Sequence, residues 1–199
     1  GRKIIEHLEA LPTADDEWLS VTFEGTAELR IYDAEDHCTG TLGAEIPGSL
    51  RFTENGELVV NLPALRSGVE DYRIVLHAAE DETADLTVSG RLGEAEISSD
   101  TKPVEIGAHQ VLRSDLSASP DDGLTIDFTT PGIPEASDGT PLPYDFDGDG
   151  NIDDEDIGEV TSRWNVCEGE PEWNPAFDLD DDGCITILDI MRVSNSKHV

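Results

Sequence analysis

The residues with the clearest chemical signal in this sequence are a dense group of carboxylates near the C-terminus. Residues 144–157 read YDFDGDGNIDDEDI and contain no basic residue. Carboxylates at such close range repel one another unless a cation lies between them. Hard divalent cations bind to sets of closely spaced oxygen ligands of this kind. The stretch therefore predicts a metal site built from five aspartates: Asp145, Asp147, Asp149, Asp153 and Asp156.

The spacing of these residues indicates which metal they bind. With Asp145 as position 1, side-chain oxygens fall at positions 1, 3, 5, 9 and 12, with glycine at position 6 and Ile152 at position 8. This is the ligand order of an EF-hand calcium loop, in which the glycine permits a sharp turn. We expect the carbonyl of Asn151 to be a ligand, Asp153 to act through a water, and Asp156 to bind with both oxygens.

The same order recurs in residues 178–189, which read DLDDDGCITILD, again with glycine at position 6 and isoleucine at position 8. Acidic composition alone does not explain two loops in the same register, so we expect two Ca²⁺ ions, one per loop. Both loops have Asp at position 12, where an EF-hand usually has Glu. The expected ligands of the second loop are Asp178, Asp180, Asp182, the carbonyl of Cys184, Thr186 and Asp189.

Composition narrows the classes of partner. The 199 residues include 45 acidic and 12 basic ones, and the formal net charge of −33 makes nucleic acid and anionic membranes poor partners. No apolar run approaches the roughly 20 residues of a membrane-spanning helix, so we expect no membrane insertion. The chain begins with Gly and its first residues lack the apolar core of a signal peptide, so we expect it to be a processed piece of a longer protein.

The chain divides at a proline- and glycine-rich segment. Residues 131–143 read PGIPEASDGTPLP and are predicted to be an extended linker between residues 17–130 and residues 144–199. Residues 1–16 contain four apolar residues at helical spacing, which predict a short lead-in helix: Ile4, Ile5, Leu8 and Leu11. Upstream of the linker, eight short segments rich in β-branched residues predict an antiparallel β-sandwich. These segments are WLSVTFE, AELRIYD, ELVVNL, YRIVLHA, ADLTVSG, AEIS, VEIG and LTIDFTT.

The sandwich segment contains no recognisable catalytic motif, such as a Gly-x-Ser-x-Gly turn or a glycine-rich phosphate loop. We therefore expect a protein without enzymatic activity. Cys38 is expected to be an exposed free thiol, since no set of metal ligands surrounds it in the sequence. The histidines are scattered and are expected to be ordinary surface or strand residues: His7, His37, His77, His109 and His198.

Helices are expected after the acidic loops and not before them. Prolines in GTPLPY and EPEWNPAF, which precede the two loops, disfavour entering helices. The first exiting helix is predicted from about Asp153 to Asn165, with Ile157, Val160 and Trp164 on one face. The second is predicted from about Ile187, with Ile190, Met191 and Ser194 at similar spacing.

Two loop–helix units with Asp at position 12, within residues 144–199, closely resemble the dockerin type I domain. The resemblance implies two calcium-stapled antiparallel helices that bind a cohesin domain, as in the cellulosome, and so attach a secreted or cell-surface protein to a complex. Dockerins use loop positions 10 and 11 for recognition. These positions are Asp154 and Glu155 in the first repeat and Ile187 and Leu188 in the second, so the two faces are not equivalent. We place the partner surface on the second repeat and include Met191 in it.

The sandwich segment is similar to the C-terminal β-domains of secreted prokaryotic hydrolases. The residues that carry this similarity are AELRIYDAEDHCTGTLGAEIPGSLRF and DYRIVLHAAEDETADLTVSG. It assigns no activity to the sandwich, so three hypotheses remain. The sandwich is a companion or spacer of a cohesin-binding dockerin, or the dockerin packs on the sandwich as an internal stabiliser, or the sandwich binds carbohydrate. The last hypothesis needs exposed aromatic side chains, for which the candidates are Trp18, Tyr32, Phe52 and Tyr72.

The three cysteines predict one disulfide, in an oxidising compartment. Cys184 contributes only its carbonyl to the second loop, so its side chain is free to point toward Cys167 at the end of the first helix. We expect these two to be linked and Cys38 to be free. The alternative is that Cys167 and Cys184 are unrelated thiols.

Overall fold

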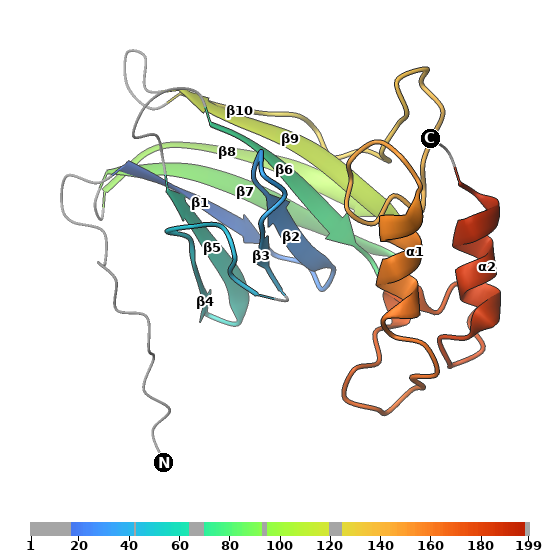
Figure 1. Ribbon diagram of the computed structural model, residues 1–199. Helices are drawn as coiled ribbons and strands as arrows, with labels where there is room; N and C mark the ends of the chain where they lie inside the picture. The colour runs from blue at the N-terminus through green and yellow to red at the C-terminus, as the bar shows by residue number, and fades with distance from the viewer. Residues whose placement is uncertain (1–16, 42, 64–69, 93–94, 120–124, 198–199) are drawn as a thin grey trace.

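The computed structural model describes residues 17–41, 43–63, 70–92, 95–119 and 125–197. In these residues two five-stranded antiparallel sheets face each other, followed by two helices, which confirms the predicted fold class (Figure 1). The first sheet has the order β4 (Leu50–Glu54), β5 (Glu57–Pro63), β1 (Glu17–Phe23), β7 (Glu82–Leu92) and β8 (Ala95–Ile106). The second has the order β10 (Thr125–Phe128), β9 (Val111–Ser119), β6 (Glu70–His77), β2 (Glu28–Tyr32) and β3 (Cys38–Gly40).

The core between the sheets follows from the two-residue period of the strands. On β1, alternate side chains point inward, and Leu19, Val21 and Phe23 are buried in this core. All five residues of strand β2 are buried. Because successive side chains of a strand point to opposite faces of the sheet, both faces of the sheet must be covered at β2. Its residues Leu29 and Ile31 belong to the core between the sheets. The other face of the second sheet must therefore also be covered.

All eight predicted strand segments lie on strands of the structure, with two differences. AEIS and VEIG are the two ends of one strand, β8, whose polar middle pairs in register with β7. The segments that form β3, β4 and β9 were not predicted as strands, because none of them has a run of apolar β-branched residues. The expected lead-in helix lies outside the described residues.

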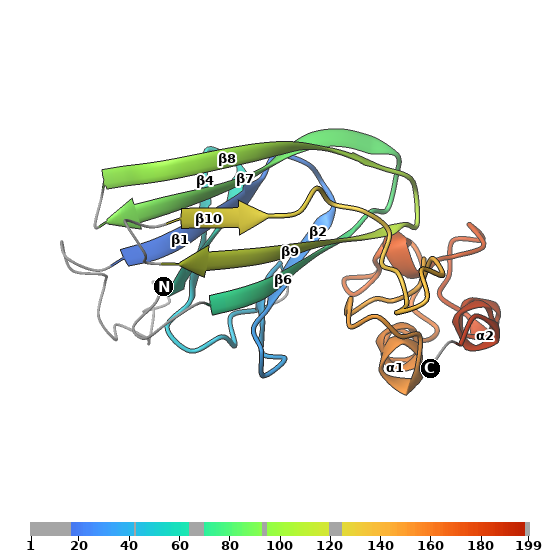
Figure 2. The same cartoon turned by 90° about the horizontal axis from the view of Figure 1, so that it is seen from above.

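The C-terminal region contains the helices α1 (Asp154–Thr161) and α2 (Ile187–Asn195) and the short 3₁₀ helix η1 (Pro175–Phe177). The two α-helices lie beside one another at one end of the sandwich, and α2 is the farther from it in both views (Figures 1 and 2). None of the helices in the described part of the chain has the length and apolar content that a membrane span requires.

Helix α1 is shorter than predicted. It ends at Thr161, and Trp164, which was expected on its apolar face, is 61% exposed. Asn165 adopts a left-handed conformation with φ of 65°, and its N–H donates to the carbonyl of Ile185. The chain therefore leaves the helix to pair with the second loop. On α2 the buried residues are Asp189 and Val193, and Ser194 is exposed.

A second apolar cluster covers the outer face of the second sheet. Tyr32, Val75 and Val111 from the sandwich pack in it against C-terminal side chains that include Phe146 and Phe177. The segment predicted to be an extended linker contributes to this cluster, with Ala136 and Leu142 both buried. It also folds back on itself, since the N–H of Leu142 donates to the carbonyl of Pro134. Ala136 and Leu142 thus anchor this segment to the shared cluster, while most of its other residues are exposed.

Candidate calcium sites and partner surface

The first loop is held by hydrogen bonds from its own backbone to two buried carboxylates. Asp145 accepts from the N–H groups of Asp149 at 3.0 Å and Gly150 at 2.9 Å. Gly150 has a φ of 98°, a conformation that glycine adopts without strain. Asp156, in the first turn of α1, accepts from the N–H groups of Phe146 at 2.6 Å and Asp153 at 2.8 Å. Positions 1 and 12 are thereby brought to the same centre.

The second loop repeats this arrangement. Asp178 accepts from the N–H groups of Asp182 at 3.2 Å and Gly183 at 2.8 Å. Asp189, in the first turn of α2, accepts from the N–H groups of Leu179 and Thr186, both at 2.7 Å. Both helices begin with a capping box, in which the residue at position 9 is the N-cap and the aspartate at position 12 completes the reciprocal pair. Local sequence thus fixes both loops in the same conformation.

The side chains at positions 1, 3 and 5 converge in each loop. The groups Asp145, Asp147, Asp149 and Asp178, Asp180, Asp182 each place one carboxylate oxygen per residue within 4.8 Å of one another. The Oδ1 atom of Asp180 is buried without a hydrogen-bond partner. An oxygen-only donor set with an orphaned buried oxygen fits Ca²⁺.

The electrostatics of the loops also favour a cation. Asp145, Asp156, Asp178 and Asp189 are buried, and no salt bridge among the described residues involves them. Burial raises the pKa of Asp145 to about 7 and that of Asp156 to about 7. Ionising these carboxyls in the bare loop is therefore unfavourable, and a divalent ion between them would reverse that cost.

Residues 143–196 match the family model of the dockerin type I domain. The match includes both loops and both helices, and no curated protein and no solved structure matches the chain. A dockerin domain is a non-catalytic, calcium-dependent module that binds a cohesin domain. The two acidic clusters fit its calcium loops.

Within this dockerin region, the remaining predicted ligands also take part in hydrogen bonds of the loops. Asp153 and Thr186 are N-caps, accepting from the N–H groups of Glu155 and Leu188. Asn151 donates its N–H to Asp149, and Cys184 donates its N–H to Asp182. The ligand roles of all twelve residues stay predictions.

The predicted disulfide is confirmed. Cys167 and Cys184 are bonded at an S–S distance of 2.06 Å, and the backbones around them pair antiparallel. The bond ties the segment after α1 to position 7 of the second loop. Cys38 is free, as predicted, although it is half-buried instead of exposed, and burial raises the pKa of its thiol.

The predicted partner residues of the second repeat lie together on the outside of the dockerin region. Ile187, Leu188 and Met191 on α2 are 55%, 52% and 49% exposed. Asp154 and Glu155, at the matching positions of the first repeat, are also exposed, and Asp154 pairs with Lys197 at 2.6 Å. The apolar face of α2 is therefore uncovered although the dockerin region packs on the sandwich.

A buried network of charges joins the dockerin region to the sandwich. Arg30 on β2 contacts Glu28 at 2.6 Å and Glu159 of α1 at 3.3 Å. Burial alone would lower the pKa of Arg30, but the two carboxylates raise it above its ordinary value. Arg163 also binds Glu159 at 3.0 Å, and Asn174 donates to Glu28 at 2.8 Å. Sequence reasoning missed this network, because the partners lie far apart in the chain.

Two of the histidines that were expected to be ordinary strand or surface residues contact the dockerin region. His77, at the end of β6, is buried and contacts the carbonyl of Phe146. His109 pairs with Asp181 of the second loop at 2.9 Å. His37 pairs locally with Asp33, and His7 and His198 lie outside the described residues.

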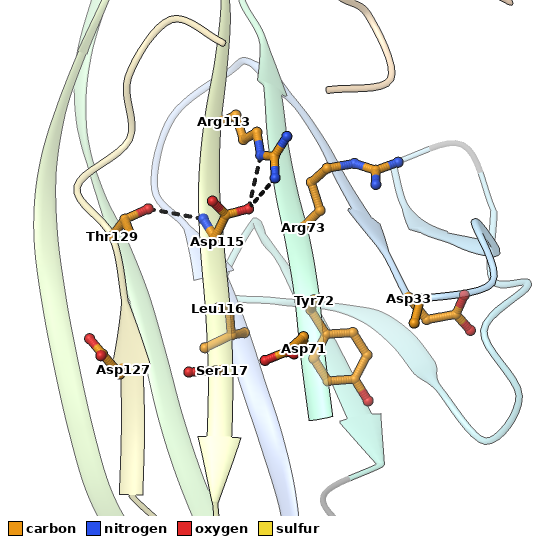
Figure 3. Close-up of a pocket in the computed structure, with 11 residues that line it drawn as sticks. Asp33, Asp71, Tyr72, Arg73, Arg113, Asp115, Leu116, Ser117, Asp127 and Thr129 are labelled. Carbon is orange, nitrogen blue, oxygen red and sulfur yellow. Dashed lines mark hydrogen bonds and ion pairs between the residues drawn. The ribbon is translucent and has the colours of Figure 1, made fainter. Parts of the chain in front are cut away.

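Beside the first loop, the outer face of the second sheet has an open hollow of about 440 Å³. Its lining is polar, and Figure 3 shows Arg73 on β6 and Arg113 on β9 among aspartates of neighbouring strands. Both arginines are engaged, Arg73 with Asp36 at 3.1 Å and Arg113 with Asp115 at 2.7 Å. The hollow offers no free cationic group for an anionic ligand.

Proposed function

We propose that this chain is a non-catalytic module pair, in which a calcium-loaded dockerin binds a cohesin through the exposed face of α2. The observation that carries this proposal is that Ile187, Leu188 and Met191 are exposed together on one helix, whereas the other large apolar side chain exposed in the described part of this region, Trp164, lies apart from them in the sequence. An exposed cluster of this kind is typical of an interaction surface. Asp154 and Glu155 occupy the same loop positions in the first repeat, and they contribute less to cohesin binding because they offer charged side chains and no apolar surface.

The bound calcium would be held by the twelve predicted ligands, one ion in each loop. Its contribution is electrostatic, since it would draw together carboxylates that otherwise repel one another. The backbone N–H groups that bind Asp145, Asp156, Asp178 and Asp189 orient these carboxylates for that role.

We assign the sandwich the role of a companion module that also stabilises the dockerin internally. The shared apolar cluster and the Arg30 network support this second function. The two roles are compatible, because the sandwich contacts the calcium loops and α1 while the exposed triad lies on α2. Cohesin binding and internal docking therefore use different faces.

The carbohydrate-binding alternative has less support. Tyr72 is buried in the sandwich core and Tyr32 lies in the cluster under the dockerin region. Trp18 is half-buried, and Phe52 is exposed. The four aromatic side chains do not form one exposed platform.

A secreted or cell-surface location fits the module. The Cys167–Cys184 disulfide is of the kind that persists in oxidising compartments. Calcium loops of modest affinity are filled where calcium is abundant, as it is outside cells.

The test is Ile187→Asp, measured for binding to a panel of immobilised cohesin domains in saturating calcium. Losing one buried Ile weakens binding between about tenfold and a hundredfold. The melting temperature should hardly change, because the side chain is exposed and Asp is favourable in a first helical turn. Asp154→Asn, at position 10 of the first loop, is the matched control and should have the smaller effect. If Ile187→Asp lowers the melting temperature and spares cohesin binding, the proposed surface is wrong.

A further inference from the structure

The sandwich donates hydrogen bonds to three consecutive carbonyls of the first calcium loop. The Nε2 atom of His77 lies 2.6 Å from the carbonyl oxygen of Phe146. The Nε atom of Arg73 donates to the carbonyl of Asp147 at 2.9 Å, and Nη1 of Arg113 donates to that of Gly148 at 2.7 Å. These carbonyls belong to loop positions 2, 3 and 4. The three donors lie on adjacent strands, where the register pairs Val75 with Arg113 and His77 with Val111.

His77 acts here as a neutral donor. Burial lowers its pKa well below the usual value, and the nearby Arg30 lowers it further. Because its partner at Nε2 is a carbonyl, which only accepts, the Nε2 atom must carry the proton. The contact therefore places no charge beside the loop.

The second loop obtains the equivalent hydrogen bond from its own helix. Nη1 of Arg192 donates to the carbonyl of Leu179 at 2.7 Å, and Leu179 is position 2 of that loop. The residue at the same place in the first repeat is Glu159, which is an acceptor and binds Arg30 and Arg163. The first repeat therefore lacks the internal donor that the second repeat has, and His77 supplies it from the sandwich.

We infer that His77, Arg73 and Arg113 are positioning residues of the first calcium site, so that calcium binding at this site is coupled to docking on the sandwich. The second loop has its position-2 carbonyl bound from within its own repeat, and the sandwich contacts this loop through His109, which pairs with the exposed side chain of Asp181 and not with a loop carbonyl. The inference rests on the proposed calcium binding. Donors outside the ligand shell fix the loop backbone before the ion arrives, which raises the affinity. Linkage requires that calcium at the first site strengthens docking by the same factor.

The test uses calorimetric calcium titration of the full chain with one loop disabled at a time. In an Asp178→Ala background, which leaves the first site, His77→Leu should weaken calcium binding about tenfold, the value of one buried hydrogen bond. In an Asp145→Ala background, which leaves the second site, the same substitution should change the affinity by less than about twofold. His77→Gln, which retains an N–H donor, should restore part of the loss.

Arg192→Met is the reciprocal control, and it should weaken the second site and spare the first. Arg73→Met and Arg113→Met provide a test that does not alter the buried His77. Removing a positive charge alone would strengthen cation binding, so a weaker first site in these variants reports the lost hydrogen bond.

The inference is overturned if all three sandwich variants leave the first site within about twofold of the parent, or if His77→Leu weakens both sites equally. It is also overturned if Arg192→Met weakens the first site as much as the second. Absence of calcium binding by the unaltered chain would instead refute the proposed function itself, and the inference with it.

Discussion

Arg30→Met tests how strongly the sandwich holds the dockerin region. The Arg30 side chain is buried and contacts Glu28, Glu159 and the hydroxyl of Tyr32. Without Arg30, Glu159 still has its ion pair with Arg163, whereas Glu28 has only the hydrogen bond from the side-chain amide of Asn174. The substitution therefore leaves the buried Glu28 carboxylate without its cationic partner.

Removing one partner of a buried ion pair costs about 3 to 5 kcal/mol, because the remaining charge stays desolvated. For a chain of this size, 1 kcal/mol corresponds to roughly 2 to 4 °C of melting temperature. Arg30→Met is therefore expected to lower the melting temperature by roughly 6 to 20 °C. Differential scanning calorimetry in saturating calcium measures this shift.

Two further variants identify the cause. Arg30→Met combined with Glu28→Gln removes the uncompensated charge, so it should recover much of the loss. Lys197→Met breaks the exposed pair with Asp154 and should change stability by less than about 1 kcal/mol. The reasoning is refuted if Arg30→Met lowers the melting temperature no more than Lys197→Met does, or if the double variant is as unstable as the single one.

Three other outcomes are expected. Calorimetry should find two calcium ions per chain, with Asp145→Ala and Asp178→Ala each removing one and Asp154→Ala removing none; a stoichiometry of one would contradict the assignment. The pKa of His77 is depressed in the folded state, so below about pH 6.5 the unfolded chain binds a proton at this residue that the folded chain does not. The free energy of unfolding should therefore fall as the pH is lowered below that value, by up to about 1.4 kcal/mol per pH unit. His77→Gln should remove this part of the pH dependence, and an unchanged slope in urea unfolding would argue against it. Reduction of the Cys167–Cys184 disulfide with dithiothreitol should destabilise the dockerin region by about 3 kcal/mol. If the helical circular dichroism signal melts at the same temperature in the reduced and the oxidised protein, that value is wrong.

The two acidic loops could be predicted from the sequence because all their expected ligands are local. Twelve consecutive residues carry the oxygens, the glycine and the apolar anchor, and the capping boxes that orient Asp156 and Asp189 also lie within the loops. The disulfide could be predicted for a related reason, since Cys167 and Cys184 are only 17 positions apart and both lie within the dockerin region.

Contacts between the two parts could not be predicted in this way. Arg30 and Glu159 are 129 positions apart, and neither has a local signal that indicates a partner. The burial of Leu142 and Ala136 in the shared cluster was not predicted, because the prolines and glycines around them give no sign of a packing partner. Helix α1 was predicted too long because Asn165 pairs with Ile185, a residue from the other repeat.

The two repeats carry different residues at the same helical position, Glu159 in the first and Arg192 in the second, and this difference explains why the first repeat contacts the sandwich there and the second does not. Glu159 in the first repeat pairs with cations, one of them on the sandwich, whereas Arg192 in the second binds its own loop. The repeat whose position-2 carbonyl is bound by the sandwich is the first, and the repeat that binds this carbonyl with its own Arg192 carries the exposed apolar residues of α2. Because the first repeat docks on the sandwich, α2 lies farther from the sandwich than α1 in both views (Figures 1 and 2), and its side chains Ile187, Leu188 and Met191 are exposed. A sandwich that holds the first loop would therefore also set the position of the proposed partner surface on α2.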